Sequence, residues 1–552
     1  MSASAADVVV SFDQSYLSTC SHVGLMCRLG NVQELQQLLR SGDGDAYPHD
    51  AHDNRGWYPI HEAAFGGHTA CVRALTAVAD LPDYVNHRSH DGTTPLILAC
   101  QKAHRDCVAE LLRAGADPNV GTLDDMYPLM AAIRHCRMDL VQLLLEAGAD
   151  PSRVYWNGWT CLHEAACYGF VDALELLVRN GCPLLAVDDD GLSCLFVAAQ
   201  YGALNVVKEL LRLADLHNAR AALLNLPTND GATPVYIAAQ EGYDRVLVEL
   251  AAAGASMNEC TDEDNVHPIV PAVRHNHSRS LRILLAHCEK NALNESAEDP
   301  VMQAVESNSF DCLKLLVEHE LPVDRWSRES VNVTTSHEYL KPLFHRPNIT
   351  PLGRALLKGR TEMVPLLLSD GAQRTFNDAN CHSPLALAVF KRQNPQFLRQ
   401  FIKLGTDLSS FSSNSLCPSV PDCLLVAVHP LFFSQLATLL QCGLSPRLGD
   451  WCHCNNTNYS LLSELQNLFP AKDIAKLIRC VSTFVADLPN CCERWRGLRE
   501  AVDRRDIPSL AHLSRVAIRK TIRPSELLDD AWADDLKLPN LLKDHVLYRN
   551  TD

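Results

Sequence analysis

Hydrophobic and polar positions follow a helical period over Asp91–Asn119, and this stretch predicts one small folding unit. Asp91-Gly92 is a turn dipeptide, and Pro95 stands where the first turn of a helix tolerates its missing N–H. Leu96–Cys100 predicts a short apolar helix, followed by a polar break and a second helix. The second helix carries its apolar residues on one face: Cys107, Val108, Leu111 and Leu112. Gly115 follows at the position of a left-handed cap, and because neither helix can bury its apolar face alone, the unit needs neighbouring copies.

The same unit recurs along the chain, and the residue equivalent to Pro95 serves as the anchor of each copy. The anchors are Pro59, Pro95, Pro128, Cys161, Cys194, Pro234, Pro268, Pro300, Pro351 and Pro384. Most spacings between anchors lie between 32 and 36 residues, with longer ones of 40 and 51. A period near 33 with T-P-L-x-x-A and a terminal L-L-x-x-G-A-D resembles the ankyrin repeat. The resemblance implies an all-α ankyrin-repeat solenoid of about 10–12 repeats, in which each repeat contacts only its neighbours.

Five segments are expected from the quality of the repeats. Residues 1–52 contain an N-terminal segment and a first partial repeat, and residues 53–258 hold the regular repeats, with a small insertion around Leu216–Leu226. Residues 259–447 hold degenerate repeats, with a long insert at about 321–349. Residues 448–507 predict a linker and helices that cap the stack, and residues 508–552 form a separate tail.

The amino-acid composition indicates which class of partner the protein binds and in which compartment it is located. The chain of 552 residues has a net charge of −17, which disfavours nucleic-acid binding and favours a protein partner with a basic surface. Met1–Phe12 lacks a basic start and a long apolar run, and no stretch of about 18 apolar residues follows, so neither export nor membrane insertion is expected. The expected location is cytoplasmic, open to nuclear entry. Three of the 22 cysteines share one repeat position, twelve residues after the anchor, which indicates buried thiols in a reducing compartment: Cys71, Cys107 and Cys312.

The sequence contains little that indicates a catalytic or metal-binding site. His61 and His163 lie in PIHEAA and CLHEAA, where a structural histidine that binds turn backbone is far more frequent than a catalytic one. Cys452-His453-Cys454 with Cys491-Cys492 is the one zinc hypothesis, but its spacing departs from the usual C-x₂₋₄-C pairs. The chain contains no nucleophile elbow, phosphate loop, kinase or dinucleotide motif. We expect no enzyme activity, no cofactor and no metal.

The turns of the repeats are the predicted substrate-binding face, because turn tips line the extended concave surface of such a stack. Their candidate residues are aromatic or acidic: Trp57, Asp124, Asp125, Tyr155, Trp156, Trp159 and Asp189. Exposed Trp and Tyr are favoured in binding hot spots, and carboxylates steer a basic partner. The alternative, given equal weight, is that Trp57 and Trp159 pack on neighbouring turns and that the acids are solvated or bind turn backbone. Tyr155 and Trp156 precede their turn and are the stronger candidates.

The tail carries two further motifs. Leu510, Ser514 and Ile518 recur every four residues after Pro508, and Leu513 widens their apolar face. A second apolar block follows after a polar gap, with Leu536, Leu538, Pro539, Leu542 and Tyr548. Together these motifs resemble a SOCS box. The first block is similar to its Elongin C-binding half, with Ser514 where most relatives have Cys, and the second to its cullin-binding half, with Lys537 in place of the first Pro of L-P-L-P.

Ankyrin repeats followed by such a tail resemble the ankyrin-and-SOCS-box family. The resemblance implies a substrate-recognition subunit of an Elongin–cullin–RING ubiquitin ligase that makes no covalent bond itself. Its implied partners are Elongin C, Elongin B, a cullin (of the cullin-five type) with its RING subunit, and a protein substrate with a basic surface. The implied Elongin C contacts are Pro508, Leu510, Leu513, Ser514 and Ile518, and the implied cullin contacts are Leu536, Leu538, Pro539, Leu542 and Tyr548. An ankyrin scaffold or adaptor without ligase recruitment remains the alternative.

Overall fold

The computed structural model describes most of the repeat region and little of the tail. The described residues are 20–40, 52–78, 83–155, 157–261, 265–288, 296–325, 348–369, 383–391, 395–403, 422–428, 432–442, 444 and 470–482. Across these ranges the regular secondary structure is helical, with turns and single β-bridges between the helices. None of the helices in these ranges is both long and apolar enough to cross a membrane.

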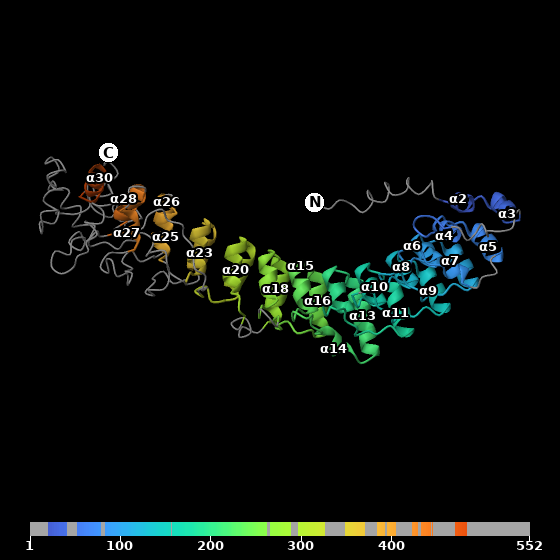
Figure 1. The fold of residues 1–552 in the computed structure, drawn as a ribbon. Coiled ribbons are helices and arrows are strands. Elements are labelled where there is room, and N and C mark those ends of the chain that lie inside the picture. The colour runs from blue at the N-terminus through green and yellow to red at the C-terminus, as the bar shows by residue number, and fades with distance from the viewer. Residues whose placement is uncertain are drawn as a thin grey trace. The chain divides into compact units, whose positions relative to one another are not determined.

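The chain divides into two compact units, whose boundary runs through α17 and α18 (Figure 1). The helices of the first unit are α2 (His22–Leu29), α3 (Val32–Arg40), α4 (Pro59–Phe65), α5 (Thr69–Val78), η1 (Tyr84–Asn86), α6 (Pro95–Gln101), α7 (Arg105–Arg113), α8 (Pro128–Arg134), α9 (Met138–Glu146), α10 (Cys161–Cys167), α11 (Val171–Arg179), α12 (Cys194–Gln200), α13 (Leu204–Leu216), α14 (Arg220–Leu224), α15 (Pro234–Glu241) and α16 (Asp244–Ala253). The boundary helices are α17 (Ile269–Arg274) and α18 (Ser278–His287). The second unit contains α20 (Pro300–Ser307), α21 (Phe310–Glu318), α23 (Pro351–Lys358), α24 (Met363–Ser369), α25 (Pro384–Phe390), α26 (Pro395–Lys403), α27 (Asp422–Ala427), α28 (Phe433–Gln441) and α30 (Ala471–Ser482).

Each unit is a stack of helix pairs. In the first unit the leading helices α4, α6, α8, α10, α12 and α15 pack in sequence, and so do the trailing helices α5, α7, α9, α11, α13 and α16. In the second unit α20, α23, α25 and α27 form the row of leading helices, and α30 contacts α28. Most of these helices have seven to ten residues, fewer than the 12–15 that an isolated helix needs in water. The stacking of apolar faces therefore supplies their stability, as predicted for ankyrin repeats.

The anchor positions mark the helix starts. Nine of the ten predicted anchors are the first residue of a leading helix, and α17 begins one residue after Pro268. The residue before the anchor is often a Ser or Thr that caps the helix: the Thr94 hydroxyl accepts from the Ile97 N–H at 3.3 Å, and the Ser193 hydroxyl from the Phe196 N–H at 3.1 Å. Gly115 has a φ of +92°, which confirms the left-handed cap predicted after α7. The local sequence signals and the stack agree at these positions.

In three successive helix pairs, the side chain nine residues after the anchor contacts the pair before it. His68 lies 3.0 Å from the Arg28 carbonyl, and His104 lies 3.1 Å from the Phe65 carbonyl, each through Nε2. In the next pair the Arg137 guanidinium donates to the Ala103 carbonyl at 3.2 Å. These carbonyls belong to helix ends, where the backbone lacks intrahelical partners. Each contact therefore gives a helix-end carbonyl of one repeat a hydrogen-bond partner from the next repeat.

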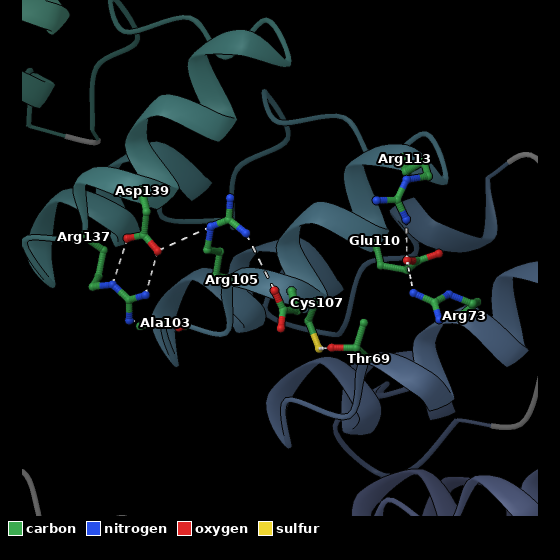
Figure 2. Close-up of polar contacts among 10 residues, drawn as sticks. Thr69, Arg73, Ala103, Arg105, Cys107, Glu110, Arg113, Arg137 and Asp139 are labelled. Carbon is green, nitrogen blue, oxygen red and sulfur yellow. Dashed lines mark hydrogen bonds and ion pairs between the residues drawn. The ribbon is translucent and has the colours of Figure 1, made fainter.

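The trailing helices carry a second set of contacts between repeats (Figure 2). The Glu110 carboxylate of α7 bridges Arg73 of α5 at 3.0 Å and Arg113 at 2.6 Å. Asp139 of α9 pairs with Arg105 of α7 at 3.7 Å and with Arg137 of its own repeat at 2.8 Å. Because the arginines are largely exposed, each pair adds only about 0–1 kcal/mol. These pairs orient neighbouring helices more than they stabilise them.

The three cysteines at the shared repeat position are buried and free, which confirms the predicted packing role. Cys71, Cys107 and Cys312 are fully shielded from solvent, and the Cys107 thiol lies 3.3 Å from the Thr69 hydroxyl. Burial raises the pKa of all three thiols, so they remain protonated at neutral pH. They are small apolar fillers between helices.

His61 and His163 bind turn backbone, as the sequence predicts. His163 Nδ1 accepts from the Thr160 N–H at 3.1 Å, and its Nε2–H donates to the Leu192 carbonyl of the next turn at 2.9 Å. His61 repeats this arrangement with Tyr58 at 3.1 Å and Thr93 at 3.2 Å. Both rings are buried and each is held in the neutral form, with the proton on Nε2 assigned from this network. Each histidine therefore joins its own helix start to the following repeat.

Acid is expected to destabilise the stack through His61. Burial lowers the pKa of His61 from 6.5 to about 4, so between these values the unfolded chain binds a proton that the folded chain excludes. The free energy of unfolding therefore falls as the pH drops through this window, by about 3 kcal/mol in total for this residue. Urea unfolding followed by circular dichroism between pH 7 and pH 4.5 measures the loss. His61→Gln removes the titrating group and should lose less stability over the same window; an equal loss in both proteins would contradict the assignment.

The structure describes some of the irregular parts of the chain. The insertion around Leu216–Leu226 lengthens α13 and forms the extra helix α14. The degenerate repeats at 259–447 contain helix pairs, and α27 with α28 is the last pair among the described residues. Most of the insert at about 321–349 lies outside the described residues, as do the linker around 448–460 and the whole tail 508–552.

Candidate protein-binding surface

A short polar side chain closes most of the turns that precede the leading helices. The Asp53 carboxylate accepts from the Trp57 N–H at 2.9 Å, and the Asp188 carboxylate accepts from the Leu192 N–H at 2.7 Å. Thr228 does the same for the Ala232 N–H at 3.0 Å. Asp188 is buried in this role, so within its acidic run only the next two residues face solvent. The first aspartate of the run is structural.

The exposed carboxylates lie at the tips of these turns. Asp124, Asp125 and Asp189 are all exposed. Backbone hydrogen bonds join successive tips: the Leu123 N–H donates to the Asp91 carbonyl at 3.0 Å, and the Asp189 N–H donates to the Asn157 carbonyl at 2.9 Å. Backbone hydrogen bonds therefore hold the tips together within each of these two pairs of neighbouring repeats.

Trp57 belongs to a half-buried cluster at the first full repeat. Its ring stacks on His61 at 6.2 Å, and the Arg55 guanidinium lies 3.8 Å above it. Arg55 also pairs with Asp53 at 2.6 Å and with Glu62. Burial raises the pKa of Glu62, although Arg55 opposes the rise. The indole thus packs on its own repeat and keeps one edge toward solvent.

Trp159 forms the corresponding cluster three repeats later. Its ring lies 5.1 Å from His163, and its Nε1–H donates to Glu164 at 2.8 Å. The other oxygen of Glu164 accepts from Arg134 of the preceding repeat at 2.7 Å. The Glu164 carboxylate is nearly fully buried, and its two donors compensate for the lost solvation. Trp57 and Trp159 therefore both pack on their own repeat, whereas the alternative to binding placed them on neighbouring turns.

Tyr155 takes the place of the turn-closing residue in this repeat. Its backbone closes the turn, since its N–H donates to the Trp159 carbonyl at 2.7 Å and its carbonyl accepts from the Gly158 N–H at 2.9 Å. Its half-buried phenol is close enough to Arg134 to interact with it electrostatically. Trp156, the neighbouring candidate, lies outside the described residues.

Two exposed tyrosines extend this cluster, and sequence reasoning did not select them. Tyr168 and Tyr201 cap the C-terminal ends of α10 and α12, and they are 46% and 54% exposed. Tyr168 interacts electrostatically with Arg134, and a hydrogen bond to Cys167 raises the pKa of Tyr201. We call Tyr155, Trp159, Tyr168 and Tyr201, with the Arg134–Glu164 pair between them, the aromatic patch. Its members come from three successive repeats, and large exposed aromatic groups of this kind are typical of protein-binding surfaces.

The described part of the chain offers no obvious catalytic or metal centre. Within it, no group of three or more His, Cys, Asp or Glu side chains is placed to hold a metal ion. Burial raises the pKa of Cys182 and Cys194 to about 12, which leaves these thiols unreactive at neutral pH. The cysteines of the zinc hypothesis, Cys452, Cys454, Cys491 and Cys492, lie outside the described residues, as do all Elongin and cullin candidates between Pro508 and Tyr548.

Comparison with known proteins identifies the repeats. A family model for ankyrin repeats in three copies matches residues 24–122, 184–259 and 235–327, and a second model for ankyrin repeats in many copies matches residues 129–178. Ankyrin repeat and SOCS box protein 3 is 40% identical over 116 residues, which is 21% of this chain and 21% of the cattle protein or 22% of the human one. Ankyrin repeat and SOCS box protein 2 from rat is 30% identical over 109 residues, 20% of this chain and 16% of the relative.

The family models and the individual relatives cover different shares of this chain. The match spans about a fifth of the length of the ankyrin repeat and SOCS box proteins, whereas the two repeat models together cover more than half of the chain. The helix pairs, the anchors at their starts and the histidine bridges between them are the physical counterpart of this match. The chain therefore belongs to the ankyrin-repeat family, and about a fifth of it is homologous to the ankyrin repeat and SOCS box proteins.

Proposed function

We propose that this chain is a non-catalytic substrate receptor of an Elongin–cullin–RING ubiquitin ligase. Its ankyrin repeats bind the target protein, and its tail 508–552 docks on Elongin C with Elongin B and on a cullin that carries the RING subunit. The observation that carries the proposal is the order of motifs: an ankyrin stack whose homologues are named for a SOCS box, followed in this chain by a tail with both halves of such a box.

The tail motifs support two separate contacts. The four-residue spacing predicts one apolar helix face for Elongin C, formed by Leu510, Ser514 and Ile518 with Pro508 and Leu513 beside them. Leu536, Leu538, Pro539, Leu542 and Tyr548 supply the cullin contact, and the cullin-five type is the expected partner. Ser514 buries less apolar surface than a Cys, and Lys537 replaces a Pro, so both positions are expected to tune affinity rather than abolish docking.

The chain acts by proximity. A target held on the ankyrin repeats stays near the ubiquitin-charged E2 that the RING subunit recruits, which raises the local concentration of its lysines. No residue of the receptor has to react, and the buried, hydrogen-bonded His61 and His163 suit a structural role. The helices of residues 448–507, of which α30 is described, would close the stack before the tail, and the expected location is cytoplasmic.

A direct capture experiment tests the proposal. The purified full chain and a version that ends at Ile507 are each mixed with the purified Elongin B–Elongin C pair and passed over a size-exclusion column. Co-elution of the full chain but not of the shortened one supports the receptor function. Failure of the full chain to co-elute refutes it and leaves an ankyrin adaptor without ligase recruitment. Equal circular dichroism of the two proteins controls for folding.

A further inference from the structure

The aromatic patch lies beside a row of carboxylates that have no internal counter-charge. Five aspartates are exposed at the turn tips that precede α8, α12 and α15: Asp124, Asp125, Asp189, Asp190 and Asp230. Among the described residues, none of the five forms an ion pair. Asp125 has a φ of +55° where neighbouring repeats have glycine, so its backbone adopts a conformation that few side chains favour.

The cations of the same repeats are already neutralised. Between residues 121 and 243 the chain has seven Lys and Arg residues, and each forms an ion pair with an acidic side chain: Arg134, Arg137, Arg153, Arg179, Lys208, Arg212 and Arg220. Four of them, from Arg179 onward, belong to the trailing helices α11 and α13 and the extra helix α14. The only cation within the aromatic patch, Arg134, is bound to Glu164 at 2.7 Å. The free charge of this face is therefore negative.

Exposed phenol rings and carboxylates together suit one kind of ligand. A guanidinium or ammonium group is attracted to the face of an aromatic ring, and a guanidinium forms bidentate hydrogen bonds with a carboxylate. Tyr168 and Tyr201 offer two such rings from adjacent repeats, and Asp189 and Asp190 offer two carboxylates on a backbone-bonded tip. Nucleic acid and acidic segments would meet repulsion from the same row. A wholly apolar helix would leave the carboxylates desolvated without partners.

We infer that the turn tips and leading helices from Asp124 to Tyr243 bind an extended segment of the partner protein that is rich in arginine and lysine. The cationic side chains lie over Tyr168 and Tyr201 and pair with the aspartates of the tips, and Trp159 and Tyr155 contact the apolar parts of the segment. This inference rests on the proposed function, because it names the chemistry of the substrate that the receptor holds. The length of the face, four consecutive repeats, suits an extended segment better than a single side chain.

A random dodecapeptide library displayed on phage tests the inference with the full chain as bait. Peptides recovered from the wild-type chain should contain at least twice as many Arg and Lys residues as the input library. The highest-ranked peptide, labelled with a fluorophore, then reports affinity by anisotropy, which should fall as salt rises because the contacts are ionic. A recovered pool without Arg and Lys enrichment overturns the inference.

Matched variants locate the binding site. Asp189→Asn with Asp190→Asn, and separately Tyr168→Ala with Tyr201→Ala, should each weaken the labelled peptide at least tenfold. Tyr168→Phe with Tyr201→Phe keeps the rings and should retain most of the affinity. Glu146→Gln with Asp172→Asn removes the same charge from exposed positions on α9 and α11 and should change affinity less than twofold. An equal loss in this control would show general charge attraction and refute the site.

Different experimental results would refute the ligase proposal and the basic-segment inference. The Asp189, Asp190, Tyr168 and Tyr201 variants should co-elute with the Elongin B–Elongin C pair as the wild-type chain does. Loss of Elongin capture by the wild-type chain with peptide selection intact would refute the ligase proposal alone. Normal Elongin capture with no Arg and Lys enrichment would refute the basic-segment inference alone.

Discussion

His163→Leu is expected to lower the free energy of unfolding by roughly 1.5–4.5 kcal/mol. Leucine has a similar volume but cannot accept from the Thr160 N–H or donate to the Leu192 carbonyl, which His163 meets at 3.1 and 2.9 Å. The buried Thr160 N–H would be left without a partner, which costs about 1–3 kcal/mol. The Leu192 carbonyl would lose one of its two donors, because the Asp188 N–H still donates to it, and a lost hydrogen bond costs about 0.5–1.5 kcal/mol. A loss of this size is a large fraction of the stability of a typical domain, which is about 5–15 kcal/mol.

The His163→Leu substitution should destabilise the repeats that His163 joins more than it destabilises distant repeats. His163 joins α10 to the turn ahead of α12, and the stability of a repeat stack is approximately a sum of repeat and interface contributions. Hydrogen exchange of the amides in α10 and α12 should therefore accelerate more than exchange in α4 and α6. His135→Leu, at an exposed position one repeat earlier, should change stability by no more than about 0.5 kcal/mol. Similar effects of the two substitutions would show that the buried bridge is not what holds these repeats together.

The sequence predicted the fold well because the repeat leaves a local signature at each helix start. Pro95 and its counterparts need a helix first turn, and the Ser or Thr before them caps it, so period and chemistry point to the same residue. The one shifted start has a physical reason: His267 Nδ1 accepts from the Ile269 N–H at 3.2 Å and takes over part of the cap next to Pro268. The insertion around Leu216–Leu226 was located, but its fold as α14 was not predicted, because five residues are too few for a periodic pattern.

The binding face was predicted only in part, because its positions carry no packing constraint. The residue seven positions after the anchor is Gly66, Lys102, His135, Tyr168, Tyr201 and Glu241 in successive repeats. Such variety gives no period to detect, and only the side-by-side packing of α10 and α12 brings Tyr168 and Tyr201 together. The Arg134–Glu164 pair spans two repeats and was likewise hidden from a linear reading. Trp159 was found because aromatic residues stand out in a turn, although its indole proved to be bound to Glu164.

In the acidic runs, the sequence composition likewise does not show which single residue is exposed. Asp188 and Asp189 are adjacent in sequence, yet the first is buried as a turn closure and the second is exposed at the tip. Composition alone assigns both to a negative surface. The position of each relative to the Cys194 anchor separates them, because the sixth residue before the anchor closes the turn in several other repeats, as Asp53 and Thr228 do.

Leu510→Ala is expected to weaken capture of the Elongin B–Elongin C pair by about 10- to 150-fold. Burying one leucine side chain contributes about 1.5–3 kcal/mol, and each 1.4 kcal/mol changes a dissociation constant tenfold. Isothermal titration of the full chain with purified Elongin B–Elongin C measures the change directly. Ser514→Cys supplies the opposite control on the same predicted helix face: a thiol buries more apolar surface than a hydroxyl, so this variant should bind as tightly as the wild-type chain or more tightly. Unchanged affinity of a folded Leu510→Ala chain would mean that this leucine lies outside the Elongin interface and that residues 508–552 do not act as the proposed box.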